Sequence, residues 1–150
     1  MLTVYRASAG AGKTHKLTGE YLNLLFAGAG AYRRILAVTF TNKATDEMKS
    51  RIVEELYNLS SGRKSDYVDS LKSAYSLTEE QVRKQAGKIL TDILHDYSAF
   101  NISTIDRFFQ QTMRAFTREI GLQGGYGIEM DQELVLTSAI DNLLADLITI

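Results

Sequence analysis

Short apolar runs alternate along the chain with longer helical repeats of apolar residues. Residues 2–6 (LTVYR), 34–40 (RILAVTF) and 100–104 (FNIST) are brief runs rich in residues that favour strands. The segments between and after them place apolar residues three and four positions apart, which is the spacing of an amphipathic helix. The chain contains no proline, so few residues interrupt these repeats. The pattern predicts short strands that lead into long helices.

Glycine and threonine mark where several of these helices begin and end. Thr78 opens the sequence TEEQ, a capping box in which Thr78 and Gln81 each bond the backbone of the other. Gly62 has the position of a helix C-cap. The first expected helix begins near Lys13, and the second follows the apolar run at 34–40 and ends at Gly62. A short third helix covers part of residues 63–77. The remaining three run from Thr78 to about Tyr97, from Ile105 to Gly121, and onward from Asp131.

One face of each expected helix is apolar, and such a face ordinarily packs in a core. In the first four helices it consists of Leu17, Tyr21, Leu24 and Leu25; Ala44, Met48, Ile52, Val53, Leu56 and Leu59; Tyr67, Val68, Leu71 and Tyr75; and Val82, Ala86, Ile89, Leu90, Ile93 and Leu94. In the last two it consists of Ile105, Phe108, Phe109, Met113, Phe116 and Ile120; and Leu136, Ala139, Ile140, Leu143, Leu144, Leu147 and Ile148. We assign Phe108 and Phe109 to the core, and His95 to the surface.

Composition limits the classes of protein to consider. The chain has 150 residues, 45% of them hydrophobic, which is enough for one domain with a sizeable core. It has no cysteine, which excludes disulfides, thiolate metal sites and cysteine nucleophiles. No run of 18 apolar residues occurs, so we expect a soluble, cytoplasmic protein. The last helical repeat reaches Ile150 without a stop signal, so we expect a truncated chain.

Charge is unevenly distributed, although the net charge is only −1. Residues 1–52 carry eight Lys/Arg and three Asp/Glu, whereas residues 119–150 carry six acids and no Lys/Arg. A basic first third suits an anionic ligand, but solvated helix faces also account for part of the asymmetry.

The sequence ASAGAGKT fits the P-loop pattern G-x-x-x-x-G-K-[ST] at every fixed position except the first, which is Ala7. The glycines let backbone N–H groups turn inward around an anion, and the following helix directs its positive end to the same point. Lys13 would reach the β- and γ-phosphates of ATP, and the Thr14 hydroxyl would bind Mg²⁺. The predicted nucleotide-binding residues are Ala9, Gly10, Ala11, Gly12, Lys13, Thr14 and His15, with Lys13 and Thr14 catalytic and Thr14 also the metal ligand.

Two further segments, together with the P-loop, carry a resemblance to a known family. FTNKATDEM, within Ala37–Ile52, is similar to motif Ia of the UvrD/Rep-type superfamily-1 DNA helicases, which commonly have Ala at the first P-loop position. ISTIDRFFQQTMR is similar to their motif Ic, although Asp106 stands where the family often has His. ASAG-x-GKT and the long helical stretch between motifs Ia and Ic resemble the RecB/AddA branch, whose members are helicase–nuclease subunits of recombination repair.

The resemblance implies an α/β fold: a helix-rich, RecA-like P-loop NTPase with a parallel sheet and the start of an inserted helical subdomain. It divides the chain into a motor core (1–62), an inserted segment (63–98) and a return to the core (99–150). It implies an ATP- and Mg²⁺-dependent 3′-to-5′ DNA helicase of recombination repair. The implied partners are single-stranded DNA and a nuclease partner similar to AddB, with no membrane.

The ends of the predicted strands are the expected DNA-binding positions, because open α/β sheets bind ligands at the carboxyl ends of their strands. Phe40 offers an aromatic face on which a base can stack, and the helix start after it can hold a phosphate. Without the resemblance, a core position for Phe40 would be the preferred interpretation. The predicted nucleic-acid-binding residues are Phe40, Thr41, Asn42, Lys43 and Thr104.

Several parts of such an enzyme have no counterpart in the sequence. No apolar strand after the P-loop ends in an acidic pair that could complete the Mg²⁺ site, and the glutamine that usually precedes the P-loop has no room. We therefore expect the intact protein to be the enzyme and these 150 residues alone to be inactive. Two alternatives remain open, a small P-loop kinase and a non-catalytic nucleotide-sensing or partner-binding module.

Overall fold

The computed structural model of the protein describes residue 4, residues 12–116 and residues 131–148. The chain divides into two compact units, Met1–Gln110 and Gln111–Ile150, and each is described by itself. The expected strand at residues 2–6, apart from Val4, lies outside the described residues. So do the predicted site residues Ala9, Gly10 and Ala11, and the expected helix end at Gly121.

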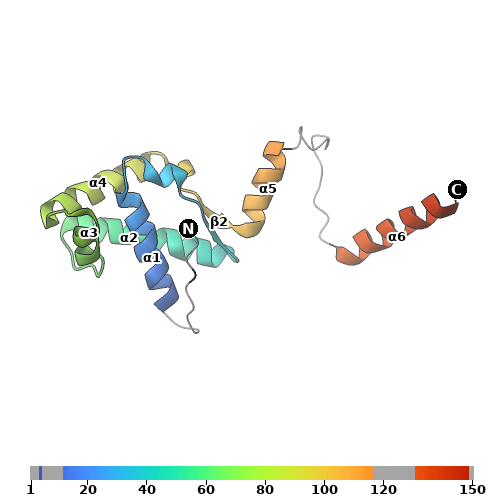
Figure 1. Cartoon of the computed structure of the whole chain (residues 1–150), viewed down its shortest axis with the longest axis horizontal. Coiled ribbons are helices and arrows are strands. Elements are labelled where there is room, and N and C mark those ends of the chain that lie inside the picture. The colour runs from blue at the N-terminus through green and yellow to red at the C-terminus, as the bar shows by residue number, and fades with distance from the viewer. Residues whose placement is uncertain (1–3, 5–11, 117–130, 149–150) are drawn as a thin grey trace. The chain divides into compact units, whose positions relative to one another are not determined.

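The described part of the chain is rich in helix and contains a small parallel sheet (Figure 1). Short 3₁₀ helices precede each strand, and each strand leads directly into a longer α-helix. The elements are α1 (Gly12–Phe26), η1 (Ala31–Arg34), β1 (Ala37–Thr39), α2 (Asn42–Ser61), α3 (Val68–Tyr75), α4 (Glu79–His95), η2 (Tyr97–Ala99), β2 (Ile102–Thr104), α5 (Ile105–Phe116) and α6 (Gln132–Ile148).

The two strands lie side by side and run in the same direction. Ala37 pairs with Ile102, and Thr39, the last residue of β1, pairs with Thr104, the last residue of β2. Both strands therefore end at the same edge, and α2 and α5 begin there. The expected strands at 34–40 and 100–104 are confirmed in position, although each is only three residues long.

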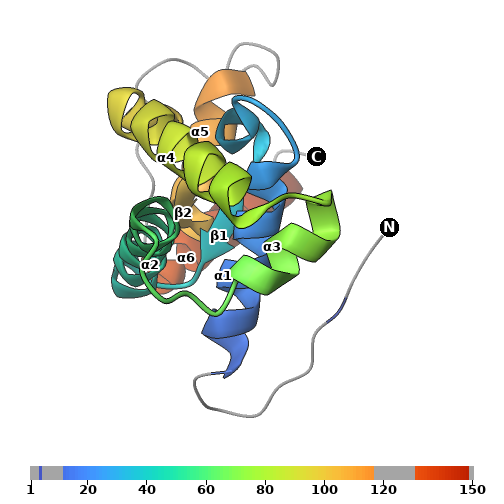
Figure 2. The same ribbon diagram turned by 90° about the vertical axis from the view of Figure 1, so that its left-hand side faces the viewer.

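The first unit has one hydrophobic core between its helices. Helix α2 packs along α4 and against α1, and α3 packs against both α1 and α4 (Figure 2). The core side chains are Tyr21, Leu22, Leu25, Phe26, Tyr32, Met48, Ile52, Leu56, Leu59, Tyr67, Leu71, Val82, Ala86, Ile89, Ile93, Phe100 and Ile102. The helices of residues 63–98 thus share their core with the helices on either side, and the three-part division of the chain stays a prediction.

The predicted helix boundaries at Gly62 and Thr78 are confirmed. Gly62 caps α2 with φ of 68°, a left-handed conformation that glycine adopts without steric cost. At the start of α4, the Gln81 N–H donates to the Thr78 hydroxyl oxygen at 3.3 Å, and the Thr78 N–H donates to the Gln81 side-chain oxygen at 2.8 Å. These two bonds are the reciprocal pair of a capping box.

For some residues the prediction of a core position is wrong. Leu17, Leu24 and Leu94 lie on helices that the pattern predicted, but their side chains are about half exposed. Helix α5 has no buried residue, and Phe109, expected in the core, is 58% exposed. Periodicity identifies a helix and its apolar face, but burial depends on how much of that face a neighbouring element covers. Among the described helices, none is long and apolar enough to cross a membrane.

Candidate nucleotide and nucleic-acid site

The first turn of α1 carries the described part of the P-loop. Gly12 opens the helix, and a Cβ at its position would meet none of the described atoms within 4 Å. Lys13 is exposed and makes no ion pair within the described residues. Thr18, a fully buried residue in the next turn of α1, stabilises this turn, because its hydroxyl donates to the Thr14 carbonyl at 2.8 Å. The geometry leaves the Lys13 ammonium available to an anion at a helix N-terminus.

The common end of the two strands carries two threonine caps. The Thr41 side-chain oxygen accepts a hydrogen bond from the Ala44 N–H at 3.1 Å, which caps α2. The Thr104 side-chain oxygen accepts one from the Arg107 N–H at 3.3 Å, at the start of α5. Two helix N-termini therefore open at one edge of the sheet, where backbone N–H groups and hydroxyl hydrogens can meet phosphate oxygens.

Further hydroxyls fix the turn between β1 and α2. The Thr39 hydroxyl lies 2.7 Å from that of Thr45, and both hydroxyls donate to the Thr41 carbonyl, at 3.1 and 3.2 Å. Thr45 is buried, so this contact anchors the turn on the core side. Phe40, Asn42 and Lys43, which lie between Thr39 and Thr45, are exposed to solvent.

Phe40 points away from the core and is 87% exposed, so the alternative of a core position is wrong. Thr41, Asn42 and Lys43 are also exposed. Leaving an aromatic ring in water is unfavourable by about 25 cal/mol per Å² of exposed apolar surface. This exposure suits a residue that meets a ligand, and the sheet edge and helix α2 place three polar residues next to it.

A small pocket lies between the first turn of α1, the end of β1 and the start of α2. It has a volume of about 160 Å³, and its lining includes Lys13 and Thr14 from α1 together with Thr39 and Glu47. The structure thus brings the described P-loop residues and the motif Ia segment to one place. Glu47 was not among the predicted site residues, because its sequence position marks it only as one acid on a helix.

The residues at this pocket fit a magnesium nucleotide in their donor types. An ammonium group, a hydroxyl and a helix N-terminus are the groups that bind triphosphates, and Mg²⁺ prefers oxygen ligands that include the phosphates themselves. Within the described ranges, no cluster of three His, Cys, Asp or Glu side chains could hold a metal ion by itself. The protein side of a Mg²⁺ site here would consist of Thr14.

Tyr67 is a second residue that the sequence pattern did not identify as part of the site. It is buried at the start of α3, and its hydroxyl donates to the His15 carbonyl at 3.1 Å. Desolvation raises the pKa of this phenol, and the charge of Glu55 adds to the effect. His15 itself is exposed, as expected, but it stacks on the Tyr67 ring. The only available signal was an aromatic residue ahead of a short helix, which gives no indication of this long-range contact.

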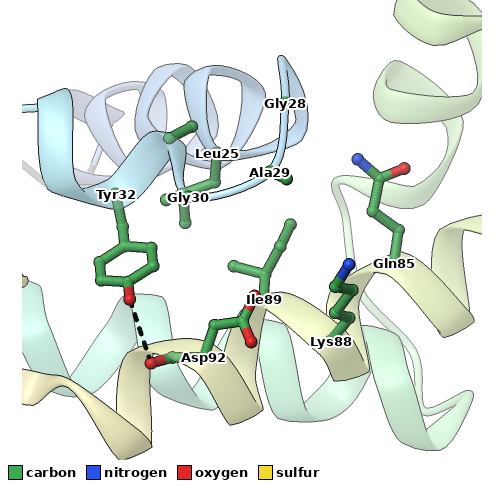
Figure 3. A pocket seen from close by; sticks show the side chains of 10 residues that line it. Leu25, Gly28, Ala29, Gly30, Tyr32, Gln85, Lys88, Ile89 and Asp92 are labelled. Atoms are coloured by element: carbon green, nitrogen blue, oxygen red, sulfur yellow. Dashed lines mark hydrogen bonds between the residues drawn. The ribbon is translucent and has the colours of Figure 1, made fainter.

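Another pocket lies at the opposite end of α1 and contains none of the predicted site residues (Figure 3). It is formed by the turn after α1 and by α4, and the Tyr32 hydroxyl donates across it to the Asp92 carbonyl at 3.3 Å. Its volume is about 160 Å³, and Leu25 and Ile89 form its apolar part.

Comparison with known proteins gives one family and several relatives. The UvrD/REP helicase N-terminal domain matches residues 2–149. The chain is 34% identical to the RecBCD enzyme subunit RecB of Borreliella burgdorferi over 76% of its length, and 32% identical to an ATP-dependent helicase/nuclease of Lactobacillus acidophilus over 84%. It is 29% identical to the ATP-dependent DNA helicase UvrD1 of Mycobacterium tuberculosis over 95%. No solved structure matches.

The chain spans only a small part of these relatives. It covers 9% of the length of each of the first two proteins and 16% of UvrD1. The matched part of each relative is therefore comparable in size to one domain.

Proposed function

The chain belongs to the UvrD/REP helicase N-terminal domain family, and on this premise we propose that it is the ATP-binding part of a 3′-to-5′ DNA helicase of recombination repair. The family implies ATP as the nucleotide and a RecA-like P-loop fold. The RecB relative and the helicase/nuclease relative, both named as subunits, support a role as a helicase–nuclease that works with a partner protein.

The observation that carries the proposal is the pocket that Lys13 and Thr14 share with Thr39. A motor that moves along a strand needs its phosphate site next to its strand-binding surface, so that changes at one reach the other. Here Thr39 ends β1, and Phe40 follows it, exposed, at the edge where α2 and α5 begin. A nucleotide at the first turn of α1 would lie next to Thr39, which directly precedes the segment proposed to bind DNA.

Seven of the predicted residues then have a role that their chemistry allows. Lys13 neutralises the terminal phosphates, and Thr14 supplies an oxygen ligand to Mg²⁺. Phe40 stacks on a base, while the N-termini of α2 and α5, with Thr41 and Thr104, hold the phosphates of the strand. Asn42 and Lys43 add donors in the first turn of α2.

Hydrolysis of ATP by the full-length protein, with and without single-stranded DNA, tests the proposal. We expect the strand to stimulate hydrolysis, because Thr39 of the nucleotide pocket directly precedes the proposed DNA-binding segment. We expect the substitution Lys13→Ala to abolish hydrolysis, because Lys13 binds the terminal phosphates. An unstimulated rate would contradict the helicase assignment. Transfer of phosphate to a small acceptor would instead identify a kinase.

A further inference from the structure

The phenol of Tyr67 is built into the first turn of α1. Its ring stacks on that of His15, with centroids 4.8 Å apart and an angle of 25°. Its hydroxyl donates to the His15 carbonyl, and its side chain is 6% exposed. One turn further along α1, Gly19 leaves room for the ring, since a Cβ at that position would lie 3.1 Å from the Tyr67 Cε1 atom. The Tyr67 ring thus packs against α1 at Gly19, where no side chain blocks it.

Two side-chain hydroxyls bond consecutive carbonyls directly after Lys13. Thr18 donates to the Thr14 carbonyl, and Tyr67 donates to the His15 carbonyl. A phenol is protonated at neutral pH, and burial raises the pKa of Tyr67 further, so its hydroxyl is a donor there. These bonds restrain the turn that carries the phosphate-binding lysine, one from within α1 and one from outside it.

The segment that holds Tyr67 is itself connected to α2. The Ser65 hydroxyl donates to the Glu55 carboxylate at 2.7 Å and accepts a hydrogen bond from the Tyr67 N–H at 3.3 Å. Asp66 lies 3.5 Å from the His15 imidazole. The residues before α3 therefore contact both α2 and the first turn of α1.

We propose that Tyr67 is a positioning residue for the nucleotide site, which couples the segment before α3 to the phosphate-binding turn of α1. This inference rests on the proposed function, because it assumes that Lys13 and Thr14 bind ATP. Tyr67 acts not on a phosphate but on the backbone: it holds the His15 carbonyl, and with it the turn that presents Lys13. A shift of this segment would loosen that turn and weaken nucleotide binding, so the segment can regulate the site.

The chain offers a matched control for this role. The hydroxyl of Tyr75, at the other end of α3, also donates to a carbonyl of α1, that of Asn23, at 2.5 Å. Tyr67→Phe and Tyr75→Phe therefore remove the same group from contacts between the same two parts of the chain. Only the first contact lies at the P-loop turn, so a merely structural role predicts equal effects of the two substitutions on nucleotide binding.

Affinity for Mg·ATP, melting temperature, and the KM for ATP are measured on full-length wild type, Tyr67→Phe, Tyr75→Phe and Gly19→Ala. We expect Tyr67→Phe to raise the Kd about three- to tenfold, the effect of one lost hydrogen bond, and to raise KM more than it lowers kcat. Tyr75→Phe should stay within about twofold of wild type, because its bond lies away from the P-loop turn. Gly19→Ala should also weaken binding, because its Cβ pushes against the Tyr67 ring, although alanine favours the helix.

Equal affinity of wild type and Tyr67→Phe, or equal weakening by Tyr67→Phe and Tyr75→Phe, would overturn the positioning role. Lys13→Ala distinguishes this failure from failure of the proposed function. If Lys13→Ala loses binding while Tyr67→Phe retains it, only the role of Tyr67 is overturned. If Lys13→Ala binds ATP like wild type, the P-loop assignment and the positioning role are both overturned.

Discussion

At the scale of single residues, Tyr21 differs from the other core residues because its buried hydroxyl adds a desolvation cost to folding. Its side chain is 3% exposed and meets Phe100 edge to face, yet its hydroxyl has no hydrogen-bond partner among the described residues. Desolvation raises the pKa of this phenol far above its ordinary value. A buried hydroxyl without a partner costs about 1–3 kcal/mol, so the hydroxyl of Tyr21 opposes folding while its ring favours folding.

We predict that Tyr21→Phe raises the free energy of unfolding by about 1 kcal/mol, because it removes the unpaired hydroxyl and keeps the ring. Stability should also fall less steeply above about pH 10 in this variant, since the folded wild type resists loss of the phenol proton that the unfolded chain gives up. Tyr75→Phe serves as the control and should lose about 1 kcal/mol, because its hydroxyl is bonded. Thermal unfolding at neutral pH and at a pH above the ordinary phenol pKa measures both. A less stable Tyr21→Phe would contradict the prediction.

Phe40 is the residue that best separates a nucleic-acid motor from other P-loop proteins. Because its ring is exposed, we predict that Phe40→Ala in the full-length protein weakens single-strand binding by about 1–3 kcal/mol. Nucleotide affinity and melting temperature should change little. Titrations with a DNA oligonucleotide and with Mg·ATP on the same variant measure this. Unchanged DNA affinity would remove the stacking role.

Sequence motifs predicted a group of site residues, some of which the structure places near one another, while their roles in binding stay predictions. The predicted residues Lys13, Thr14 and Phe40 lie near one pocket and one sheet edge. The oxygens of Thr41 and Thr104, predicted as phosphate contacts, accept hydrogen bonds from backbone N–H groups in the first turns of α2 and α5. The role of Tyr67 could not be predicted, because its bond to His15 joins positions 52 residues apart.

At the scale of elements, local rules predicted helix ends better than they predicted burial. The capping box at Thr78 and the glycine cap at Gly62 depend only on neighbouring residues, and both are present. Leu17 and Leu94 fit the helical period but lie beyond the area that neighbouring helices cover. The strands are shorter than the apolar runs that predicted them, because only three residues of each find a ladder partner.

The left-handed cap of α2 leads to a prediction about two glycines. Gly62→Ala should lower the free energy of unfolding by about 1–2 kcal/mol, because alanine is strained at a φ of 68°. The new Cβ would also displace the Arg83 guanidinium. Gly87→Ala is the matched control, since Gly87 lies within α4 and its nearest neighbour would be the Ser60 Cβ at 3.6 Å. Alanine there should stabilise by up to about 1 kcal/mol. Chemical denaturation compares the two, and equal effects would contradict the assignment of the cap.

At the scale of the whole molecule, the unit Met1–Gln110 packs its helices α1 to α4 around one core beside a two-stranded parallel sheet, and the end of β1 shares a pocket with the first turn of α1. A parallel pair requires a crossover connection, and here the chain passes through α2, α3 and α4 on its way from β1 to β2. The strand order and the register come from contacts between distant residues, so apolar runs alone could not predict them. The resemblance predicted a parallel sheet, and the structure confirms it for these two strands.

Unwinding of a short duplex by the full-length protein tests the central claim most directly. Two substrates are compared, one with a 3′ single-stranded tail and one with a 5′ tail, each with and without ATP and with wild type and Lys13→Ala. We predict that wild type separates only the 3′-tailed duplex and requires ATP, and that Lys13→Ala separates neither. Failure to unwind either substrate with ATP, or unwinding by Lys13→Ala at the wild-type rate, would contradict the claim that this chain is the ATP-binding part of a 3′-to-5′ helicase.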